Sequence, residues 1–317
     1  MKRDSLARAR QWLGPRTTHA ADWPLDVLRL AKGTTTVSVV LPARNEENTV
    51  GKIVSVIRRD LADVVDEILV VDSRSTDSTA AVAAKAGARV VHQDDVLPNM
   101  PYMSGKGEAL WKGLAASTGD LVVFIDADLR NFGAHFVTGL LGPLLTDPSV
   151  HYVKAAYDRP LGDKRGEGGR VTELLARPML NLFWPELAGF IQPLGGEYAG
   201  RRETLERVPF VTEYGVETAL LIDLLGLVGL DAMAQVDLGS REHSHQSTTA
   251  LGRMAGQIML TAWSRLEREG RIVASEPPAS LLMQFSTERE VTVTDVAVAE
   301  RPPLASVLDS LMEEGAA

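Results

Sequence analysis

The sequence predicts an α/β fold built on a mostly parallel sheet with helices on both faces. Between residues 34 and 157, short and almost continuous apolar runs alternate with segments of helical periodicity, which is typical of strands covered on both faces. Polar and glycine-containing clusters directly follow several of these runs. Because ligands of such sheets bind beyond the carboxyl ends of the strands, these clusters are the first candidates for a functional site.

The first predicted unit is a strand followed by a helix. Residues 36–41 (TVSVVL) are rich in β-branched side chains, and Pro42 is expected to end this strand. Apolar residues at positions i, i+3, i+4 and i+7 then indicate a helix, and these are Val50, Ile53, Val54 and Ile57. Asn45 or Asn48 is expected to cap that helix.

The same unit recurs along the chain. Further strands are expected at 67–71, 88–91, 121–125, 150–157 and 232–238, and helices at 108–117, 134–145, 171–187 and 215–229. Gly87 and Gly119 are expected to end the helices that precede them, as left-handed residues do. By pattern the chain divides into an arm (1–33), a strand-rich half (34–157), a more helical half (158–268) and a tail (269–317).

The composition restricts the classes of function. The 317 residues include 33 Lys and Arg against 42 Asp and Glu, a net charge of −9 that argues against a nucleic-acid binder. The absence of Cys excludes disulfides, thiolate metal sites and cysteine nucleophiles. The most apolar stretch, 219–230, is short and contains Asp223, so no membrane span is expected, and residues 1–16 lack the apolar core of a secretory signal. We therefore expect a cytoplasmic protein.

An acidic pair directly follows the strand at 121–125. Asp126 and Asp128 flank Ala127, and residues i and i+2 of an extended segment point to the same side. Two carboxylates at the end of a parallel strand suit a hard divalent cation such as Mg²⁺, which is often shared with substrate phosphates. The alternative is a solvated acidic turn.

The turns after the first two strands carry candidate hydrogen-bonding groups. In the first turn the carboxylate of Glu46 is able to accept from the donors of a ribose or a nucleobase. In the second turn, Asp72 or Ser73 offers the same kind of contact. For both turns the alternative is that the polar residues only cap the following helices.

Two glycine-containing clusters are candidate anion sites. In Gly105-Lys106-Gly107 the glycines allow a phosphate to approach a helix N-terminus and Lys106 adds a positive charge, although the spacing is not that of a P-loop. The cluster at 168–172 (GGRVT) offers a second, separate anion cradle with an arginine. A surface turn and a flexible loop are the respective alternatives.

Three motifs of the second half are less specific. Glu217 begins an almost wholly apolar helix, where it would hold sugar hydroxyls or simply favour the helix N-terminus. A further glycine pair precedes Glu197 and Tyr198. His243 and His245 follow the strand at 232–238, and imidazole is a good ligand for Mn²⁺ or Zn²⁺, although an exposed polar turn is the alternative.

Taken together, these motifs resemble those of the actinobacterial glucosyl-3-phosphoglycerate synthases. The segments that carry the resemblance are PARNEE, VVDSRSTDST, GKGEALWKGL, VVFIDADL, GGRVTELLARP, QPLGGEYAGRR and YGVETALLIDLLGLVGLDAMAQVDLG, within residues 34–265. That family comprises retaining glycosyltransferases with the GT-A fold and also contains mannosyl-3-phosphoglycerate synthases. The resemblance implies a Rossmann-like, mostly parallel sheet that binds the nucleotide sugar over 34–157 and a helical acceptor-binding half over 158–268.

The resemblance also implies roles for particular residues. Donor binding would involve Pro42, Ala43, Arg44, Glu46, Ser73, Lys106, Asp126, Ala127, Asp128 and Glu217. Acceptor binding would involve Gly168, Gly169, Arg170, Thr172, Tyr214 and His245. The metal, Mg²⁺ or Mn²⁺, would be held by Asp126, Asp128 and His243. Asp128, Glu217, Lys106 and Arg241 would take part in catalysis.

Three departures from the family pattern concern the substrates. Arg44 stands where an apolar residue is expected, His245 stands where a different polar residue is expected, and the loop before Gly168 is short and charged. The resemblance implies transfer of glucose from UDP-glucose to the 2-hydroxyl of 3-phosphoglycerate with retention, by a homodimer. Rival functions are a mannosyl-3-phosphoglycerate synthase using GDP-mannose, a sugar nucleotidyltransferase, and a nucleotide-sugar-binding protein without activity. The nucleotidyltransferase would need a glycine-rich loop after the first strand, which PARNEE does not provide.

Overall fold

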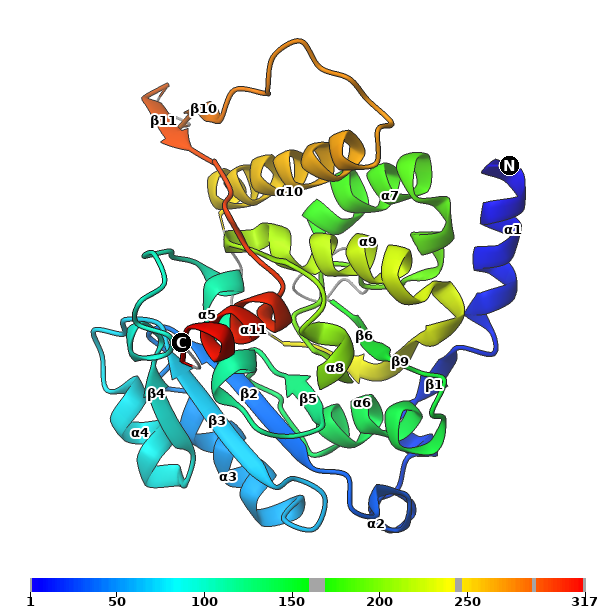
Figure 1. Cartoon of the computed structure of the whole chain (residues 1–317), viewed down its shortest axis with the longest axis vertical. Coiled ribbons are helices and arrows are strands. Elements are labelled where there is room, and N and C mark those ends of the chain that lie inside the picture. The colour runs from blue at the N-terminus through cyan, green and yellow to red at the C-terminus, as the bar shows by residue number, and fades with distance from the viewer. Residues whose placement is uncertain (1, 160–168, 243–246, 287–288, 316–317) are drawn as a thin grey trace.

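A computed structural model describes residues 2–159, 169–242, 247–286 and 289–315. Its centre is an eight-stranded sheet in the order β1-β9-β6-β7-β5-β2-β3-β4 (Figure 1). The strands are β1 (Thr17–His19), β9 (Met233–Ser240), β6 (Tyr152–Asp158), β7 (Tyr198–Arg201), β5 (Leu121–Phe124), β2 (Val37–Ala43), β3 (Glu67–Asp72) and β4 (Arg89–His92). All neighbours pair in parallel except β7, which is antiparallel to β5 and β6. The predicted mostly parallel α/β fold is confirmed.

Helices cover both faces of the sheet (Figure 1). One buried cluster joins the sheet to α2 (Leu25–Lys32), α3 (Val50–Asp60), α4 (Thr79–Ala86) and α6 (His135–Thr146). The other joins it to α1 (Lys2–Leu13), α5 (Lys106–Ala116), α7 (Arg177–Phe183), α9 (Val216–Val228), α10 (Thr248–Arg268) and α11 (Leu304–Gly315). Alternation along β2 explains the two layers, because Val39 faces the first cluster and Val40 the second.

In the first strand–helix unit the predicted apolar face of the helix is confirmed, but the end of the strand and the cap of the helix differ from the prediction. The four apolar residues predicted for α3 are all fully buried. The strand β2 does not end at Pro42 but continues to Ala43, since its register with β3 places Pro42 opposite Val71. Neither predicted asparagine caps α3, whose N-cap is Thr49 without a side-chain bond. Asn45 instead accepts a bond from the Thr76 amide at 2.8 Å and so ties the first two turns together.

The two glycines expected to end helices behave differently. Gly87 ends α4 with a φ of 105°, as predicted. The helix α5 ends before Gly119, with Ser117 as its C-cap in extended conformation. Gly119 instead allows the chain to pass close to the backbone of β2, because a Cβ there would lie 2.5 Å from the Ser38 nitrogen.

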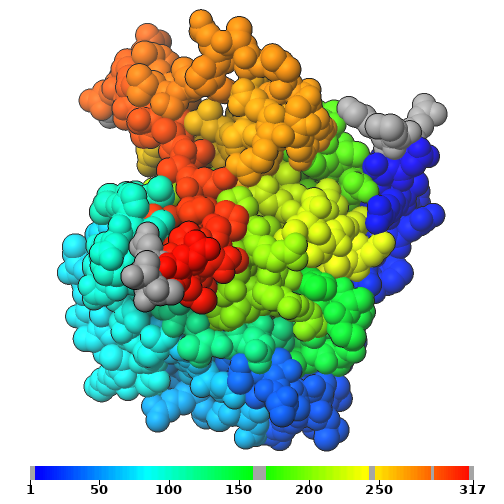
Figure 2. Space-filling view, viewed as in Figure 1, coloured from blue at the N-terminus to red at the C-terminus, as the bar shows by residue number. Residues whose placement is uncertain are grey.

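Several elements had no counterpart among the predicted ones. They include β1, β7, the 21-residue helix α10, the hairpin β10 (Leu281–Phe285) with β11 (Val291–Asp295), the short helix α8 (Arg202–Leu205), the pair β8 (Phe210–Val211) with β12 (Glu300–Arg301), and α11. Residues 296–315 run back across the body and end in α11 (Figures 1 and 2), and Leu304 at its start belongs to the same buried cluster as α5.

The N-terminal residues belong to the body of the protein. The strand β1 extends the central sheet by pairing with β9. The indole of Trp12 is buried, and its Nε1 donates to the carbonyl of Met233 at 2.9 Å. The predicted domain boundaries after residues 33, 157 and 268 stay predictions. Within the described part of the chain, every helix is too short or too polar to cross a membrane.

Candidate active site

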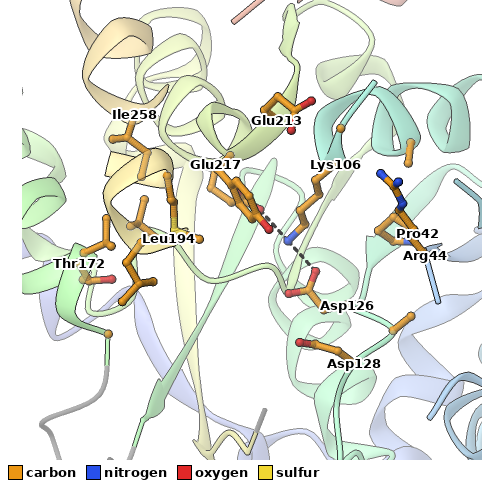
Figure 3. Close-up of a pocket in the computed structure, with 18 of the residues that line it drawn as sticks. Pro42, Arg44, Lys106, Asp126, Asp128, Thr172, Leu194, Glu213, Glu217 and Ile258 are labelled. Carbon is orange, nitrogen blue, oxygen red and sulfur yellow. Dashed lines mark ion pairs between the residues drawn. The ribbon is translucent and has the colours of Figure 1, made fainter. Parts of the chain in front are cut away.

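A cavity of about 450 Å³ lies between the carboxyl ends of β2, β3 and β5 and the helices α9 and α10 (Figure 3). Every predicted site residue that the structure describes lines it: Pro42, Ala43, Arg44, Glu46, Ser73, Lys106, Asp126, Ala127, Asp128, Gly169, Arg170, Thr172, Tyr214, Glu217 and Arg241. Its volume is within the range of small-molecule sites. Gly168, His243 and His245 lie outside the described residues.

The acidic pair is positioned by the end of β5. The chain leaves this strand with the amide of Ile125 bonded to the Val40 carbonyl at 3.1 Å, which keeps it beside β2. Asp126 and Asp128 then both accept from Nη2 of Arg241, at 2.7 and 3.2 Å. The two carboxylates therefore lie on one side of the segment, as their spacing predicted.

Lys106 bridges the two walls of the cavity. It is the first residue of α5, and its Nζ lies 2.6 Å from Oδ1 of Asp126 and 2.9 Å from Oε1 of Glu217 (Figure 3). Glu217 is nearly buried in the first turn of α9. Burial lowers the pKa of Lys106, but the nearby charges of Asp126 and Glu217 outweigh this effect and raise it overall. Lys106 is therefore a permanent cation in the cavity.

The carboxylates of the cavity differ in their affinity for protons. Burial alone would raise the pKa of Asp126, but Lys106 and Arg241 lower it to about 2. Burial and the charge of Asp126 raise the pKa of Asp128. Burial, together with the charge of Asp128, raises the pKa of Glu46 to about 7. Asp128 and Glu46 thus bind protons more tightly than ordinary carboxyls, next to an Asp126 whose charge is neutralised by Lys106 and Arg241.

Arg241 is fixed by a buried network that no sequence spacing indicated. Its Nε donates to Oε1 of Glu197 at 3.0 Å, and the other oxygen of Glu197 accepts from the Tyr157 hydroxyl at 2.6 Å. Arg159 in turn donates to the same hydroxyl at 3.0 Å. Glu197 is fully buried. The sequence showed a glycine pair before Glu197. The structure explains why Gly196 has no side chain, because a Cβ there would lie 2.0 Å from the carboxylate of Asp126.

The first two turns form one end of the cavity. The amide of Ser73 donates to the Ala43 carbonyl at 2.8 Å, which joins the two turns. The buried side chain of Gln93 donates to Oγ of Ser73 at 2.6 Å, so the hydroxyl proton of Ser73 is free for another partner. Arg44 is exposed on the cavity wall and makes no ion pair or hydrogen bond with the described residues. Polar groups here do more than cap helices, because they face an open cavity.

The opposite end of the cavity combines a cation with an apolar wall. Gly169 has a φ of 75°, and the guanidinium of Arg170 donates to Oγ1 of Thr248 at 3.2 Å. The buried hydroxyl of Thr172 has no hydrogen-bond partner among the residues that the structure describes. The apolar wall was not predicted, and it consists of Leu194, Leu251, Met254 and Ile258, the last three from α10. Their spacing of three and four residues is the signal that would have revealed it.

The carboxylates fit a hard divalent cation. Asp126 and Asp128 present oxygen ligands on one side, and Mg²⁺ or Mn²⁺ commonly takes one or two carboxylates together with substrate phosphates and water. The described residues contain no group of three or more His, Cys, Asp or Glu side chains suited to a metal. The third predicted ligand, His243, is outside the described residues.

A parallel sheet with an acidic pair at the end of β5 and a lysine facing it defines a GT-A glycosyltransferase. Consistent with this class, residues 38–193 match the model of glycosyl transferase family 2. The glucosyl-3-phosphoglycerate synthase of Mycolicibacterium paratuberculosis is 46% identical over 93% of this chain and 92% of its own length. This chain therefore belongs to the glucosyl-3-phosphoglycerate synthase family of metal-dependent glycosyltransferases.

Solved structures give the same grouping. The mannosyl-3-phosphoglycerate synthase of Rubrobacter xylanophilus has a TM-score of 0.88 and 42% identity, with 94% of this chain and 99% of that chain covered. The glucosyl-3-phosphoglycerate synthase of Mycobacterium tuberculosis, solved with Mn²⁺, UDP-glucose and phosphoglyceric acid, has a TM-score of 0.82 and 45% identity, covering 92% and 98%. The resemblance predicted from the motifs is confirmed, and glycosyl transfer is favoured over the nucleotidyltransferase and non-enzymatic alternatives.

Proposed function

We propose that this chain transfers glucose from UDP-glucose to the 2-hydroxyl of 3-phosphoglycerate, with retention of configuration. The observation that carries the proposal is one cavity with an acidic pair and Lys106 at its centre and Arg170 at one end. A nucleotide sugar and a phosphorylated acceptor are both anionic, so each would have its own cation. The M. tuberculosis relative was solved with both such molecules.

On this proposal the first two turns hold the uridine. Pro42, Ala43 and Arg44 would line the base and ribose, with hydrogen bonds from Ser73 and to Glu46. Asp126 and Asp128, with His243, would hold the divalent cation. When bound, the cation would neutralise the charge that grows on the departing diphosphate.

The remaining charged groups would act on the donor and the acceptor directly. Lys106 is fixed between two carboxylates and would lie beside the leaving diphosphate, while Arg241 keeps the acidic pair in place. Glu217 would accept from sugar hydroxyls. Arg170, with Gly169 and Thr172, would hold the phosphate or carboxylate of the acceptor, and Tyr214, Gly168 and His245 would complete that end. Most of the acceleration would come from positioning and from preorganised charge.

The charges of the cavity support a same-face reaction. The carboxylates of Asp126 and Glu217 are both paired with Lys106, and such pairing lowers their reactivity as nucleophiles. The bond between the sugar C1 and the phosphate oxygen would break while the acceptor oxygen bonds to C1 from the same side. The proton of the acceptor hydroxyl would pass to the departing phosphate oxygen. Trapping of a glycosylated Asp or Glu would overturn this mechanism.

Transfer of mannose from GDP-mannose is the second candidate. The observation that favours it is the unpaired guanidinium of Arg44, because arginine binds the O6 and N7 acceptors of guanine in a bidentate manner. The R. xylanophilus relative is named as a mannosyl-3-phosphoglycerate synthase. The two candidates share every other residue of the proposed site.

The deciding experiment is a screen of donors and acceptors. The purified chain with Mg²⁺ or Mn²⁺ would be offered UDP-glucose and GDP-mannose, each with 3-phosphoglycerate, 2-phosphoglycerate or no acceptor. Release of UDP only with UDP-glucose and 3-phosphoglycerate, and an α-linked product by NMR, support the proposal. Release of GDP from GDP-mannose would favour the second candidate, and release of pyrophosphate from a sugar phosphate would contradict both.

We also propose that the protein works in the cytoplasm as a homodimer. One face of the hairpin exposes Leu281, Met283 and Phe285 together with Val291 and Val293. Exposed apolar patches of this kind commonly mark interfaces. Light scattering on the intact protein would give the mass of two chains, and the mass of one chain would contradict the dimer.

A further inference from the structure

The C-terminal segment touches the same helix that carries Lys106 into the cavity. After β11 the chain runs down one face of the molecule and forms β12 and α11, which Figures 1 and 2 draw in orange and red. These residues lie beyond residue 193, where the match to the glycosyl transferase family 2 model ends. None of the described residues of that segment lines the cavity itself.

Arg301 is the residue through which this segment contacts α5. Its guanidinium is buried and donates to both carboxylate oxygens of Glu108, at 2.6 and 2.7 Å. Nη2 also donates to the carbonyl of Pro101 at 2.6 Å. The indole Nε1 of Trp111 donates to the carbonyl of Pro302 at 3.0 Å, and the Arg301 guanidinium lies over that indole ring. One side chain thus binds the first turn of α5 and the loop that leads into it.

The residues that Arg301 contacts lie on both sides of Lys106 in the sequence. Pro101 lies five residues before Lys106, and Glu108 lies two residues after it. Gly105, between them, has a φ of 97° and packs on Glu213, where a Cβ would lie 2.5 Å away. The backbone that aims Lys106 at Asp126 and Glu217 is therefore held on both sides by one guanidinium.

A second contact of the same segment supports the facing wall. Glu300 and Arg301 pair with β8, and the amide of Thr212 donates to the Ala299 carbonyl at 2.8 Å. The carbonyl of Val211 in β8 lies where a Cβ on Gly107 would be, at 1.8 Å. The chain then continues through Tyr214 to Glu217. The strand β12 therefore supports both α5, which carries Lys106, and the segment that leads from β8 to Glu217.

We propose that Arg301 is a positioning residue that fixes Lys106 in the donor site, and that the C-terminal segment therefore supports the active centre from outside the cavity. The identity of the donor in this proposal rests on the proposed function, whereas the position of Lys106 is observed in the structure. Arginine suits this role because its planar fork bonds to a carboxylate and a carbonyl together, whereas a lysine provides a single point charge. Loss of Arg301 would loosen the loop at 101–105 and move Lys106 away from the diphosphate.

The test compares two ways of weakening α5. The double variant Glu108→Met with Arg301→Met removes both charges, so no buried carboxylate is left unpaired. The control is Arg202→Met, since Arg202 bonds to the carbonyls of Leu114 and Gly119 at the opposite end of the same helix. Melting temperature, KM and kcat for UDP-glucose, KM for 3-phosphoglycerate, and calorimetric affinity for UDP with Mn²⁺ are measured for each.

We expect the double variant to raise the KM for UDP-glucose or lower kcat by about 10-fold or more, with the KM for 3-phosphoglycerate changed less than about 3-fold. Arg202→Met should lower the melting temperature without this donor effect. Equal effects of both variants on the donor, or none, would overturn the proposal. If the double variant does not fold, Arg301→Lys replaces it, and wild-type donor kinetics in that variant would overturn the proposal.

The two proposals fail in distinguishable ways. If the wild-type chain transfers no glucose to 3-phosphoglycerate, the proposed function fails. The affinity for UDP with Mn²⁺ still tests Arg301 in that case, because it reports the donor site without turnover. A double variant that binds UDP as tightly as the wild type would then contradict the positioning role.

Discussion

Replacing Lys106 by Met would remove a cation that touches both walls of the cavity. Its Nζ lies 2.6 Å from Asp126 and 2.9 Å from Glu217. At an effective dielectric constant of about 20, each contact is worth about 6 kcal/mol before the cost of desolvation. Breaking buried pairs of this kind typically destabilises a protein by about 3–5 kcal/mol. Methionine keeps the length of the side chain, so the change is mainly one of charge.

The same replacement should affect the reaction more than the fold. A fixed positive group at the site of developing charge is worth about 100- to 1000-fold in kcat, and we expect a loss of that size in Lys106→Met. Turnover is followed by UDP release at saturating substrates, with the melting temperature measured in parallel. Lys112→Met is the matched control, because Lys112 is a buried lysine of the same helix that bonds to the carbonyls of Val96 and Leu97.

The comparison of the two lysine variants is decisive. Both variants should have a lower melting temperature, and only Lys106→Met should lose most of its kcat. A kcat within about threefold of the wild type in a folded Lys106→Met protein would refute the role given to this residue. An equal loss of kcat in Lys112→Met would show that the effect is structural.

Three further predictions concern the ends of the cavity and its buried charge. Arg44→Leu should lower the affinity for GDP about 10-fold more than the affinity for UDP, both measured by calorimetry with Mn²⁺. Equal losses of affinity for the two nucleotides would contradict a contact between Arg44 and the base. Arg170→Lys should raise the KM for 3-phosphoglycerate by about 10-fold and leave that for UDP-glucose unchanged, since lysine lacks the bidentate geometry; an altered donor KM alone would contradict it. Burial lowers the pKa of Lys154 from 10.5 to about 7, so between these values the unfolded chain holds a proton that the native protein lacks, and stability rises with pH. From pH 7.5 to 9.5 this one group should add about 2 kcal/mol to the free energy of unfolding in urea, and Lys154→Met should lose that gain; identical pH dependence would contradict a neutral Lys154.

Local patterns were sufficient to predict the first half of the fold. The apolar stripe of α3 and the continuous strands β2, β3 and β5 each follow from neighbouring residues, and their polar turns meet because parallel strands end at one edge. The acidic pair and Lys106 could be assigned to that edge for the same reason. The strand end at Pro42 was misplaced because proline removes one donor but does not prevent pairing on through Ala43.

The second half was harder to predict because its elements depend on distant partners. The strand β7 has only four residues, YAGR, and forms because it pairs with β5 on one side and β6 on the other. The helix α10 contains two glycines and several polar residues, so its stripe of Leu251, Met254 and Ile258 is weak as a local signal. Most of its stability therefore comes from packing rather than from local propensity.

The electrostatic arrangement of the site was not accessible from spacing. Arg241 meets Asp126 across 115 positions of the chain, and Arg301 meets Glu108 across 193. Such pairs form only because the sheet brings β9 beside β6 and because the C-terminal segment returns to α5. Arg241 and Glu197 were both visible in sequence motifs, but only the structure revealed that they bond to each other and that Arg301 binds Glu108.

Asp126 and Asp128 would hold a divalent cation, which when bound would neutralise charge on the departing nucleoside diphosphate. The most direct measurement is the UDP release rate of Asp128→Ala as Mn²⁺ or Mg²⁺ is raised from zero, beside the wild type. The metal should stimulate the wild type strongly, and Asp128→Ala should lose about 100-fold or more of that stimulated rate. Undiminished metal-stimulated turnover in Asp128→Ala would contradict it.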